Sequence, residues 1–111
     1  MAYRFKPRKT FERSLAHLGQ LDPLIVDEVR DAIQILLSGD QLPQEFHDHK
    51  LTGSLANYRD FHLRDTPRGQ AASEINDVVV VYKIENQDLI LVAVDIGSHA
   101  KLFQGRFHKP K

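Results

Sequence analysis

The chain has 111 residues, 41% of them hydrophobic, which is enough for the core of one domain and too few for two. It has no cysteine, which excludes disulfide frameworks, thiolate catalysis and cysteine-ligated metal sites. No apolar run approaches the roughly 18 residues of a membrane span, and the charged segment 1–9 is unlike a secretory signal. We therefore expect one domain over residues 1–111, located in the cytoplasm, with no membrane partner.

Fifteen basic and fifteen acidic residues give zero net charge at pH 7, but their distribution is uneven. Residues 1–13 carry five basic residues against Glu12, a balance of +4, and residues 104–111 carry three basic residues, so residues 14–103 hold −7. Zero net charge is low for a nucleic-acid binder. Two basic ends can still attract an anionic partner if the fold brings them to one side, although such ends are often only solubilising.

The N-terminal third predicts a short strand and two helices. Segment 3–6 alternates and predicts an edge strand. Thr10 is a suitable N-cap for a helix whose apolar residues, spaced by four and three, end near Gly19. Asp22–Pro23 then begins a second helix, whose apolar stripe continues until Gly39. With so short a joint, the helices should pair with their apolar faces towards a sheet.

A polar loop and one alternating strand follow the helices. Segment 42–54 predicts a loop. Segment 58–64 alternates strictly, which places Asp60 and His62 on its polar face. Segment 64–76 is long for a connection between paired strands. It is expected to be a tolerated surface insertion, and a mobile flap or a turn of helix at 70–72 are the alternatives.

The C-terminal third predicts the centre of the sheet. Segments 78–84 and 89–94 are continuous apolar runs joined by a turn at 85–88, typical of a central hairpin. Ser98 can cap a last short helical turn, and a basic tail occupies 104–111. The predicted fold class is α+β: an N-terminal helical pair packed on a four-stranded, mainly antiparallel sheet with a short C-terminal helical turn.

Histidines are the side chains here that exchange protons near neutral pH, and there are six. His49 falls in the loop before the sheet, His62 on a polar strand face, and His99 at the start of the last helical turn. Each alone is typical of a solvated surface residue. If the strands pair as predicted, the three segments meet at one edge of the sheet.

A metal site is the alternative reading of the same region. His47 and His49 can share a face, and His62 or Asp60 would complete a zinc or ferrous site. Because the sequence has no second spaced ligand pair and no His-Glu-x-x-His helix, we expect no metal and no cofactor. Phe103 is either a core residue of the last turn or a platform for base stacking.

An ordered set of motifs resembles the YafQ branch of the RelE/ParE toxin superfamily over most of the chain. Its members are Leu42-Pro43, Asp48-His49-Lys50-Leu51, Gly53, Tyr58-Arg59-Asp60-Phe61-His62-Leu63, Asp77 five residues before Tyr82-Lys83, and Gly97-Ser98-His99-Ala100-Lys101-Leu102-Phe103. The resemblance implies the RelE-like fold and the toxin of a type II toxin–antitoxin module. Toxins of this branch are ribosome-dependent messenger-RNA endonucleases paired with a DinJ-like antitoxin.

The resemblance also implies roles for individual residues. His49, His62, Asp77 and His99 would form the acid–base and phosphate-orienting set, with Phe103 helping to hold the substrate. Metal-independent cleavage needs a base for the ribose 2′-hydroxyl and an acid for the departing 5′-oxygen. His49 or His62 is expected as the base, and His99 as the acid, because a helix N-terminus favours release of its proton.

Affinity for messenger RNA on the ribosome would come from the basic ends together with Lys50, Arg64, Arg68 and Lys101. The sequence departs from the family branch at Val78, where an aromatic residue is common. It also leaves two candidates for the functional carboxylate: Asp65 fits by its distance from His62, and Asp77, which we favour, by its distance from Tyr82-Lys83.

Two other function classes remain open. A ParE-like toxin has the same fold and acts by binding DNA gyrase, in which case the three histidines would be incidental. A small metal-dependent enzyme is the third possibility. Histidine substitutions separate an enzyme from a binder, and the metal content of purified protein tests the third class.

Overall fold

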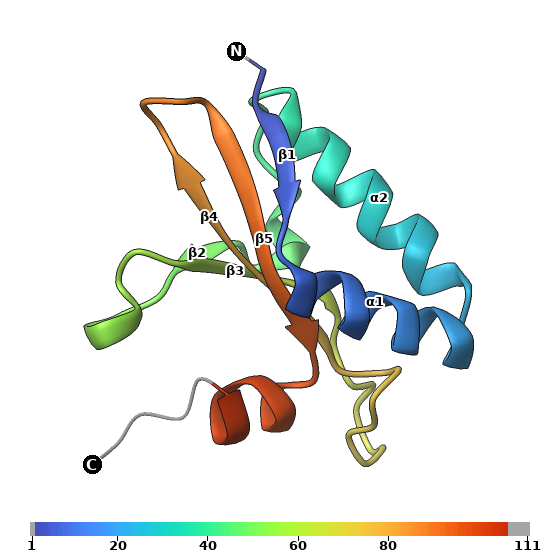
Figure 1. The fold of residues 1–111 in the computed structure, drawn as a ribbon. Coiled ribbons are helices and arrows are strands. Elements are labelled where there is room, and N and C mark those ends of the chain that lie inside the picture. Colours follow the sequence, from blue (N-terminus) through green and yellow to red (C-terminus); the bar gives the residue numbers. More distant parts are fainter. Residues whose placement is uncertain (1, 107–111) are drawn as a thin grey trace.

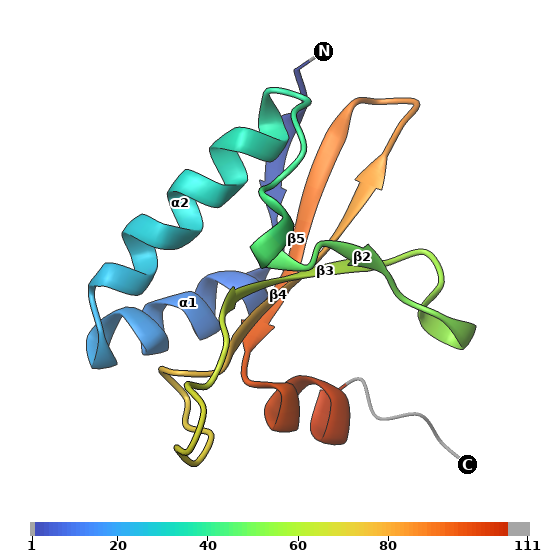
Figure 2. The ribbon, with the colours of Figure 1, turned by 180° about the vertical axis from the view of Figure 1, so that it is seen from behind.

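The computed structural model describes residues 2–106 and shows two helices against one side of a twisted mixed sheet (Figures 1 and 2). The strands are β1 (Arg4–Pro7), β2 (His49–Lys50), β3 (Arg59–Arg64), β4 (Val78–Glu85) and β5 (Ile90–Gly97). The helices are α1 (Lys9–Leu21), α2 (Leu24–Leu37), the 3₁₀ turns η1 (Gln44–Phe46) and η2 (Gly53–Leu55), and the π-helix η3 (Ala100–Arg106). The predicted α+β class is confirmed.

Helix α1 begins one residue before its predicted cap. Thr10 lies inside the helix, and its hydroxyl donates to the Val94 carbonyl of β5 at 2.8 Å, so it ties α1 to the sheet instead of capping the helix. Gly19 does not end the helix either. A Cβ at Gly19 would lie 2.9 Å from Cγ2 of Val26, so glycine is needed for the close approach of α2.

Helix α2 has the predicted limits within a residue. The Asp22 Oδ1 accepts a hydrogen bond from the Leu24 amide at 3.1 Å and satisfies one of the free N–H groups at the start. Gly39 follows the C-terminus with φ 88°, a left-handed conformation that glycine adopts without a steric penalty.

The sheet has five strands in the order β1-β5-β4-β3-β2, one more than predicted. The additional strand is β2, two residues long, which pairs antiparallel with β3. So short a strand shows no periodicity in the sequence, and its pairing partner, not its own pattern, defines it. The other neighbours are also antiparallel except β1, which pairs parallel with β5.

The two faces of the sheet are covered by different elements. Helices α1 and α2 cover the face that carries Phe61, Val80 and Tyr82. We call the opposite face the η3 face; it carries Val79, Val81, Val92 and Val94, and Leu102 of η3 packs on it. Burial on both faces explains the continuous apolar runs of β4 and β5.

The segment between β3 and β4 contains turns and no helix, so the predicted turn of helix is wrong. Its conformation is held by Asn76, whose side chain hydrogen-bonds the Thr66 hydroxyl, the Ser73 amide and the Ala71 carbonyl.

The predicted cap of the C-terminal element is confirmed, because Ser98 Oγ accepts a hydrogen bond from the Lys101 amide at 3.1 Å. The element is longer than a turn, however, since η3 continues to Arg106 and includes the first residues of the predicted basic tail. The remainder of that tail, 107–111, lies outside the described residues. Within residues 2–106, no helix has the length and apolarity of a membrane span.

Candidate active site

Three histidines from separate elements converge at the β2–β3 edge of the η3 face. His49 comes from β2, His62 from β3, and His99 immediately precedes η3. The ring centroid of His62 lies 6.2 Å from that of His49 and 4.9 Å from that of His99. The predicted meeting of these residues is confirmed, and His62 occupies the middle position.

The strand register explains the convergence. His49 pairs with Asp60, and His62 pairs with Val79 in β4. Directly paired residues of antiparallel strands project to the same side, which here is the η3 face. His99 reaches the same place because β5 ends at Gly97 beside Val79.

Each of the three imidazoles is held through its Nδ1 atom. In His62 this nitrogen lies 2.7 Å from Asp65 Oδ1, and in His99 it lies 2.6 Å from Asp77 Oδ1. In His49 it lies 2.6 Å from the carbonyl oxygen of His47. Carbonyl and carboxylate oxygens only accept, so Nδ1 carries the proton in all three rings and Nε2 remains available for chemistry.

The carboxylates of Asp65 and Asp77 serve different histidines. Asp77 is buried and accepts two hydrogen bonds from His99, from the backbone amide at 3.0 Å and from Nδ1. Asp65 is exposed, and its carboxylate lies against the His62 ring. The sequence left these two carboxylates as alternatives, and the structure places both beside the histidine cluster.

Asp60 is a site residue that the sequence analysis considered only as a metal ligand. It is 2% exposed, and burial raises the pKa of its carboxyl, while the neighbouring His49, His62 and His99 oppose that shift. Its Oδ1 lies 3.2 Å from His49 Nδ1, which donates instead to the His47 carbonyl. Among the described residues this oxygen therefore lacks a hydrogen-bond partner. The alternation of β3, which placed Asp60 beside His62, was the available signal.

One set of residues at this site could hold a metal ion. His49, Asp60 and His62 each offer one ligand atom, and these atoms lie within 4.8 Å of one another. Two imidazoles and a carboxylate suit zinc or another transition metal, and the unpartnered Asp60 oxygen would gain a partner. His47, the other histidine of the predicted metal alternative, contacts His62 with a centroid separation of 5.4 Å.

A second network fixes the short strand that carries His49. The Tyr82 hydroxyl donates to the Asp48 carboxylate at 2.7 Å, and Arg59 Nε lies 3.3 Å from the same carboxylate. Burial and the adjacent Asp48 raise the pKa of Tyr82, so the hydroxyl remains a donor. Asp48 immediately precedes His49, and this network therefore holds β2 from the side opposite the histidines.

The predicted substrate-binding residues are only partly brought together. The Phe103 ring lies 6.0 Å from that of His99 and is half-buried in η3. Lys50 is exposed next to His49, and Lys101 follows His99 by two residues. Arg64 is different: its guanidinium donates to Glu28 of α2 at 2.9 and 2.6 Å.

Arg64 also donates to Asp22 at 2.8 Å and to the Ile75 carbonyl. The hydrogen bonds to Glu28 raise the pKa of Arg64, and Arg64 in turn lowers that of Asp22. This arginine ties β3 and the following segment to the helices, and its donors are occupied by carboxylates. The expectation that Arg64 binds substrate is therefore not supported by its position.

Comparison with known proteins identifies the family. Residues 3–104 match the family described as the bacterial toxin of type II toxin–antitoxin system, YafQ. A Haemophilus influenzae protein named "Putative toxin YafQ" is 33% identical over 82 residues, which cover 72% of this chain and 70% of that protein.

Solved structures share the fold. The metal-bound toxin from Helicobacter pylori is 26% identical with a TM-score of 0.75, covering 93% of this chain and 100% of that one. The toxin fold of the Escherichia coli DinJ–YafQ complex gives 23% identity and a TM-score of 0.70, with coverage of 93% and 99%. The match across residues 3–104 shows that the chain belongs to the YafQ family of type II toxin–antitoxin toxins.

Proposed function

We propose that this toxin is an endoribonuclease that cleaves messenger RNA on the ribosome, in the cytoplasm, without a metal ion. The observation that supports this most is the convergence of His49, His62 and His99, each tethered at Nδ1 and presenting Nε2. Two proton transfers and one developing negative charge must be served in metal-free RNA cleavage, and three imidazoles suffice for all three tasks.

In the proposed reaction, His49 takes the proton of the ribose 2′-hydroxyl. The 2′-oxygen attacks the adjacent phosphorus, and the bond from phosphorus to the 5′-oxygen breaks. His99 gives its proton to that departing oxygen, so the products are a 2′,3′-cyclic phosphate and a 5′-hydroxyl. Base and acid must act on opposite sides of the phosphorus, and His49 and His99 flank His62 in the cluster.

His62 then faces the phosphate itself, where a protonated ring would stabilise the charge of the transition state. Asp77 is a positioning residue, because it contacts His99 and fixes its tautomer and orientation. The network of Asp48, Tyr82 and Arg59 positions His49 in the same indirect way.

The substrate contacts follow from the same geometry. Phe103 offers a ring beside His99 on which a base can stack, a contact that tolerates different sequences. Lys101 adds charge near the phosphates, whereas Lys50 is in register with Arg59 and so projects to the face covered by the helices, away from the histidines. The site is open, since the side chains of His49 and His99 are 51% and 46% exposed. The ribosome would therefore supply the substrate alignment that so open a site lacks.

We also propose a DinJ-like antitoxin as the partner. An Escherichia coli YafQ of the same fold is found in complex with DinJ, and membership of a toxin–antitoxin family implies a cognate inhibitor. The antitoxin would cover or distort the histidine cluster.

The test is single-turnover cleavage of messenger on programmed ribosomes by the wild type and by His49→Ala, His62→Ala and His99→Ala, with mapping of transcript ends. Each substitution is expected to reduce the rate by roughly 10²-fold or more, the usual contribution of one proton-transfer group. His17→Ala is the matched control, since His17 is exposed and contacts Glu74 away from the cluster. Near-normal rates in all three variants would reject the proposed mechanism.

Expression in cells separates this proposal from gyrase binding. A nuclease loses its effect on growth with each of the three substitutions, while its antitoxin binding persists. Growth arrest by the histidine variants without transcript cleavage would instead support the ParE-like alternative.

A further inference from the structure

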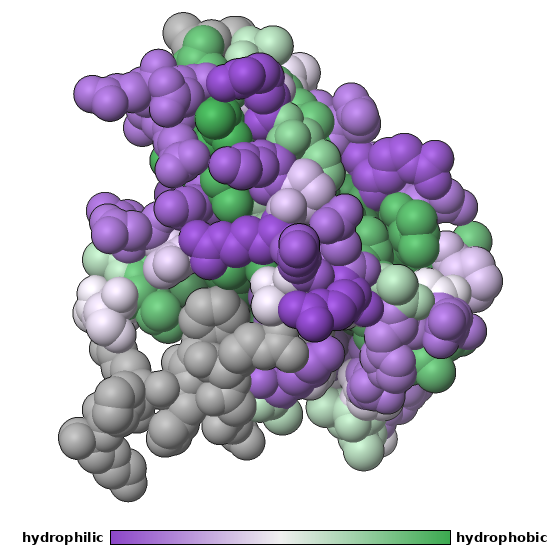
Figure 3. Space-filling view, viewed as in Figure 1, coloured by the Kyte–Doolittle hydropathy of each residue, from purple (hydrophilic) through white to green (hydrophobic). Residues whose placement is uncertain are grey.

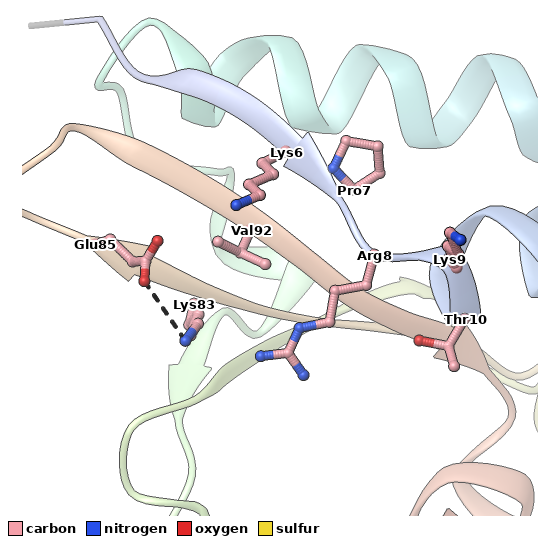
Figure 4. A pocket seen from close by; sticks show the side chains of 8 residues that line it. All are labelled: Lys6, Pro7, Arg8, Lys9, Thr10, Lys83, Glu85 and Val92. Atoms are coloured by element: carbon pink, nitrogen blue, oxygen red, sulfur yellow. Dashed lines mark ion pairs between the residues drawn. The ribbon is translucent and has the colours of Figure 1, made fainter.

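A basic groove lies on the η3 face near the β1 edge of the sheet, on the same face as the histidines but towards the opposite edge. Its cavity has a volume of about 600 Å³, and Figure 4 shows Lys6, Arg8 and Lys83 beside Val92. Lys9 also lines it, and the single acidic lining residue, Glu85, is paired with Lys83 at 3.7 Å. Within residues 2–106, the side chains of Lys6, Arg8 and Lys9 form no ion pair, so their charge is available to a ligand.

The parallel pairing of β1 with β5 creates this groove. Lys6 is in register with Val92, and Val92 with Lys83, so residues far apart in the sequence form one row across three strands. Side chains of one row share a face. The basic N-terminal segment, which the sequence analysis could not place, therefore lies on the face that also carries the histidine cluster.

The distance between groove and cluster suits an extended RNA strand. Three strand spacings separate β1 from β3, which is about 14 Å across the sheet at roughly 4.8 Å each. The row of Lys6 and Lys83 is also offset along β4 from Val79, the partner of His62, by about 13 Å, so groove and cluster are about 20 Å apart, or a few nucleotides. A second cavity of about 370 Å³ shares Thr10 with the groove and is lined by Arg13, His17 and Lys101. Basic side chains thus continue from the groove to Lys101, two residues after His99.

We propose that this groove binds the phosphodiester backbone of the messenger a few nucleotides away from the cleaved bond. The inference rests on the proposed nuclease function and adds Lys6, Arg8 and Lys83 as backbone contacts. Phosphate contacts of this kind carry no sequence information; they set the position of the strand and contribute salt-dependent affinity.

The experiment compares Arg8→Gln and Lys6→Gln with Arg30→Gln, which removes the same charge from α2 on the other side of the molecule. Binding to programmed ribosomes is measured in a His62→Ala background, so that the messenger stays intact. A long messenger is compared with one trimmed to the codon at the cleavage site, and ribosomes without messenger are a third arm. Affinity for the purified cognate antitoxin is measured in parallel.

Arg8→Gln and Lys6→Gln are expected to weaken binding to the long messenger several-fold, and to make the log–log salt slope shallower by about 0.7 per charge. Arg30→Gln and the trimmed messenger should show no such loss. The single-turnover rate of Arg30→Gln in the active background should equal that of the wild type.

Equal affinities of Arg8→Gln and Arg30→Gln for the long messenger would overturn the proposal. A loss that persists on ribosomes without messenger would assign the groove to ribosomal RNA, and a loss confined to the antitoxin would assign it to an acidic protein segment; either overturns the messenger assignment. Because binding is measured without cleavage, failure of the groove is distinguishable from failure of the nuclease mechanism.

Discussion

At the residue scale, each imidazole of the histidine cluster is oriented by a hydrogen-bond acceptor that another residue supplies. His62 and His99 lie against carboxylates, and His49 against a backbone carbonyl. Of these acceptors, Asp77 is the most buried and the most fully used, since it binds both the ring and the backbone amide of His99. Substitution at this acceptor therefore tests positioning separately from proton transfer.

Asp77→Asn is expected to lower the single-turnover cleavage rate by roughly 10²-fold, because an amide nitrogen facing Nδ1 favours the wrong tautomer of His99. Rate against pH on programmed ribosomes is the measurement, and the His99-dependent limb should move. Asp27→Asn, which removes an exposed carboxylate of α2, is the matched control. An unaltered rate and pH profile in Asp77→Asn would show that His99 needs no such support.

Asp60 predicts a pH dependence of stability. Burial raises the pKa of this carboxyl in the folded state, so its ionisation there costs free energy that the unfolded chain does not lose. This cost is absent at a pH below the pKa that Asp60 has in the unfolded chain. It grows as the pH rises above that value, and it is complete once the pH exceeds the raised pKa of the folded state.

Asp60→Asn should therefore raise the free energy of unfolding more at pH 8 than at pH 4, measured by urea denaturation across that range. Asp31→Asn, on the surface of α2, provides the control. A uniform loss of stability at every pH would mean that the carboxylate has a stabilising contact in the fold.

At the element scale, β2 is the least self-sufficient part of the site. It has two residues, and the Tyr82–Asp48–Arg59 network holds it from the side opposite the histidines. Because His49 follows Asp48 directly, a loosened network displaces the proposed base.

Tyr82→Phe removes the hydroxyl from a partly buried carboxylate and should reduce the free energy of unfolding by about 1–3 kcal/mol. Cleavage should fall as well, and chemical denaturation together with single-turnover kinetics measures both effects. Tyr3→Phe is a control for loss of a hydroxyl elsewhere in the chain. Unchanged stability would show that Arg59 alone satisfies Asp48.

The elements predicted correctly from the sequence are those that have their own hydrophobic pattern or their own capping and terminating residues. The stripe of α2, bounded by Asp22 and Gly39, and the apolar runs of β4 and β5 are examples. The elements that were missed or shortened depend on partners distant in sequence: β2 on β3, and η3 on the valines of the η3 face. The role of Thr10 was wrong for the same reason, since its acceptor is Val94 of β5.

At the scale of the whole molecule, the net charge is zero, but the acidic and basic side chains occupy different places in the fold. The acidic excess of residues 14–103 includes carboxylates that are internally occupied, such as Asp22 and Glu28 with Arg64. The basic N-terminal segment, in contrast, lines a groove on the face of the histidines. Figure 3, which has the viewpoint of Figure 1, shows a band of hydrophilic side chains across this side of the molecule. The sequence suggested this possibility but could not decide it, because the parallel β1–β5 pairing leaves no local signal.

Whether cleavage requires a metal ion is also tested on the whole protein, by its activity on ribosomes. The proposed reaction uses imidazoles alone, so toxin that is stripped with EDTA and dialysed free of the chelator before it is added to Mg²⁺-containing ribosomes should cleave at an unchanged rate. Zn²⁺ added to the toxin should inhibit, because ligation by His49, Asp60 and His62 would occupy the nitrogens needed for proton transfer. Stripping the zinc-loaded toxin in the same way should restore activity. Loss of cleavage by the stripped toxin, with recovery on adding zinc or another transition metal, would contradict the proposed mechanism.

The position of β4 in the sheet has a consequence for synthesis and recombinant expression. Its four consecutive valines are fully buried only when β5 lies beside them and η3 has closed over one face. A chain interrupted before Ile90 lacks both β5 and His99, so the proposed mechanism predicts that it does not cleave messenger. It also exposes a β-prone apolar segment with an unpaired edge, which favours aggregation. Such truncated products should therefore accumulate in inclusion bodies and, on the proposed mechanism, should not arrest growth.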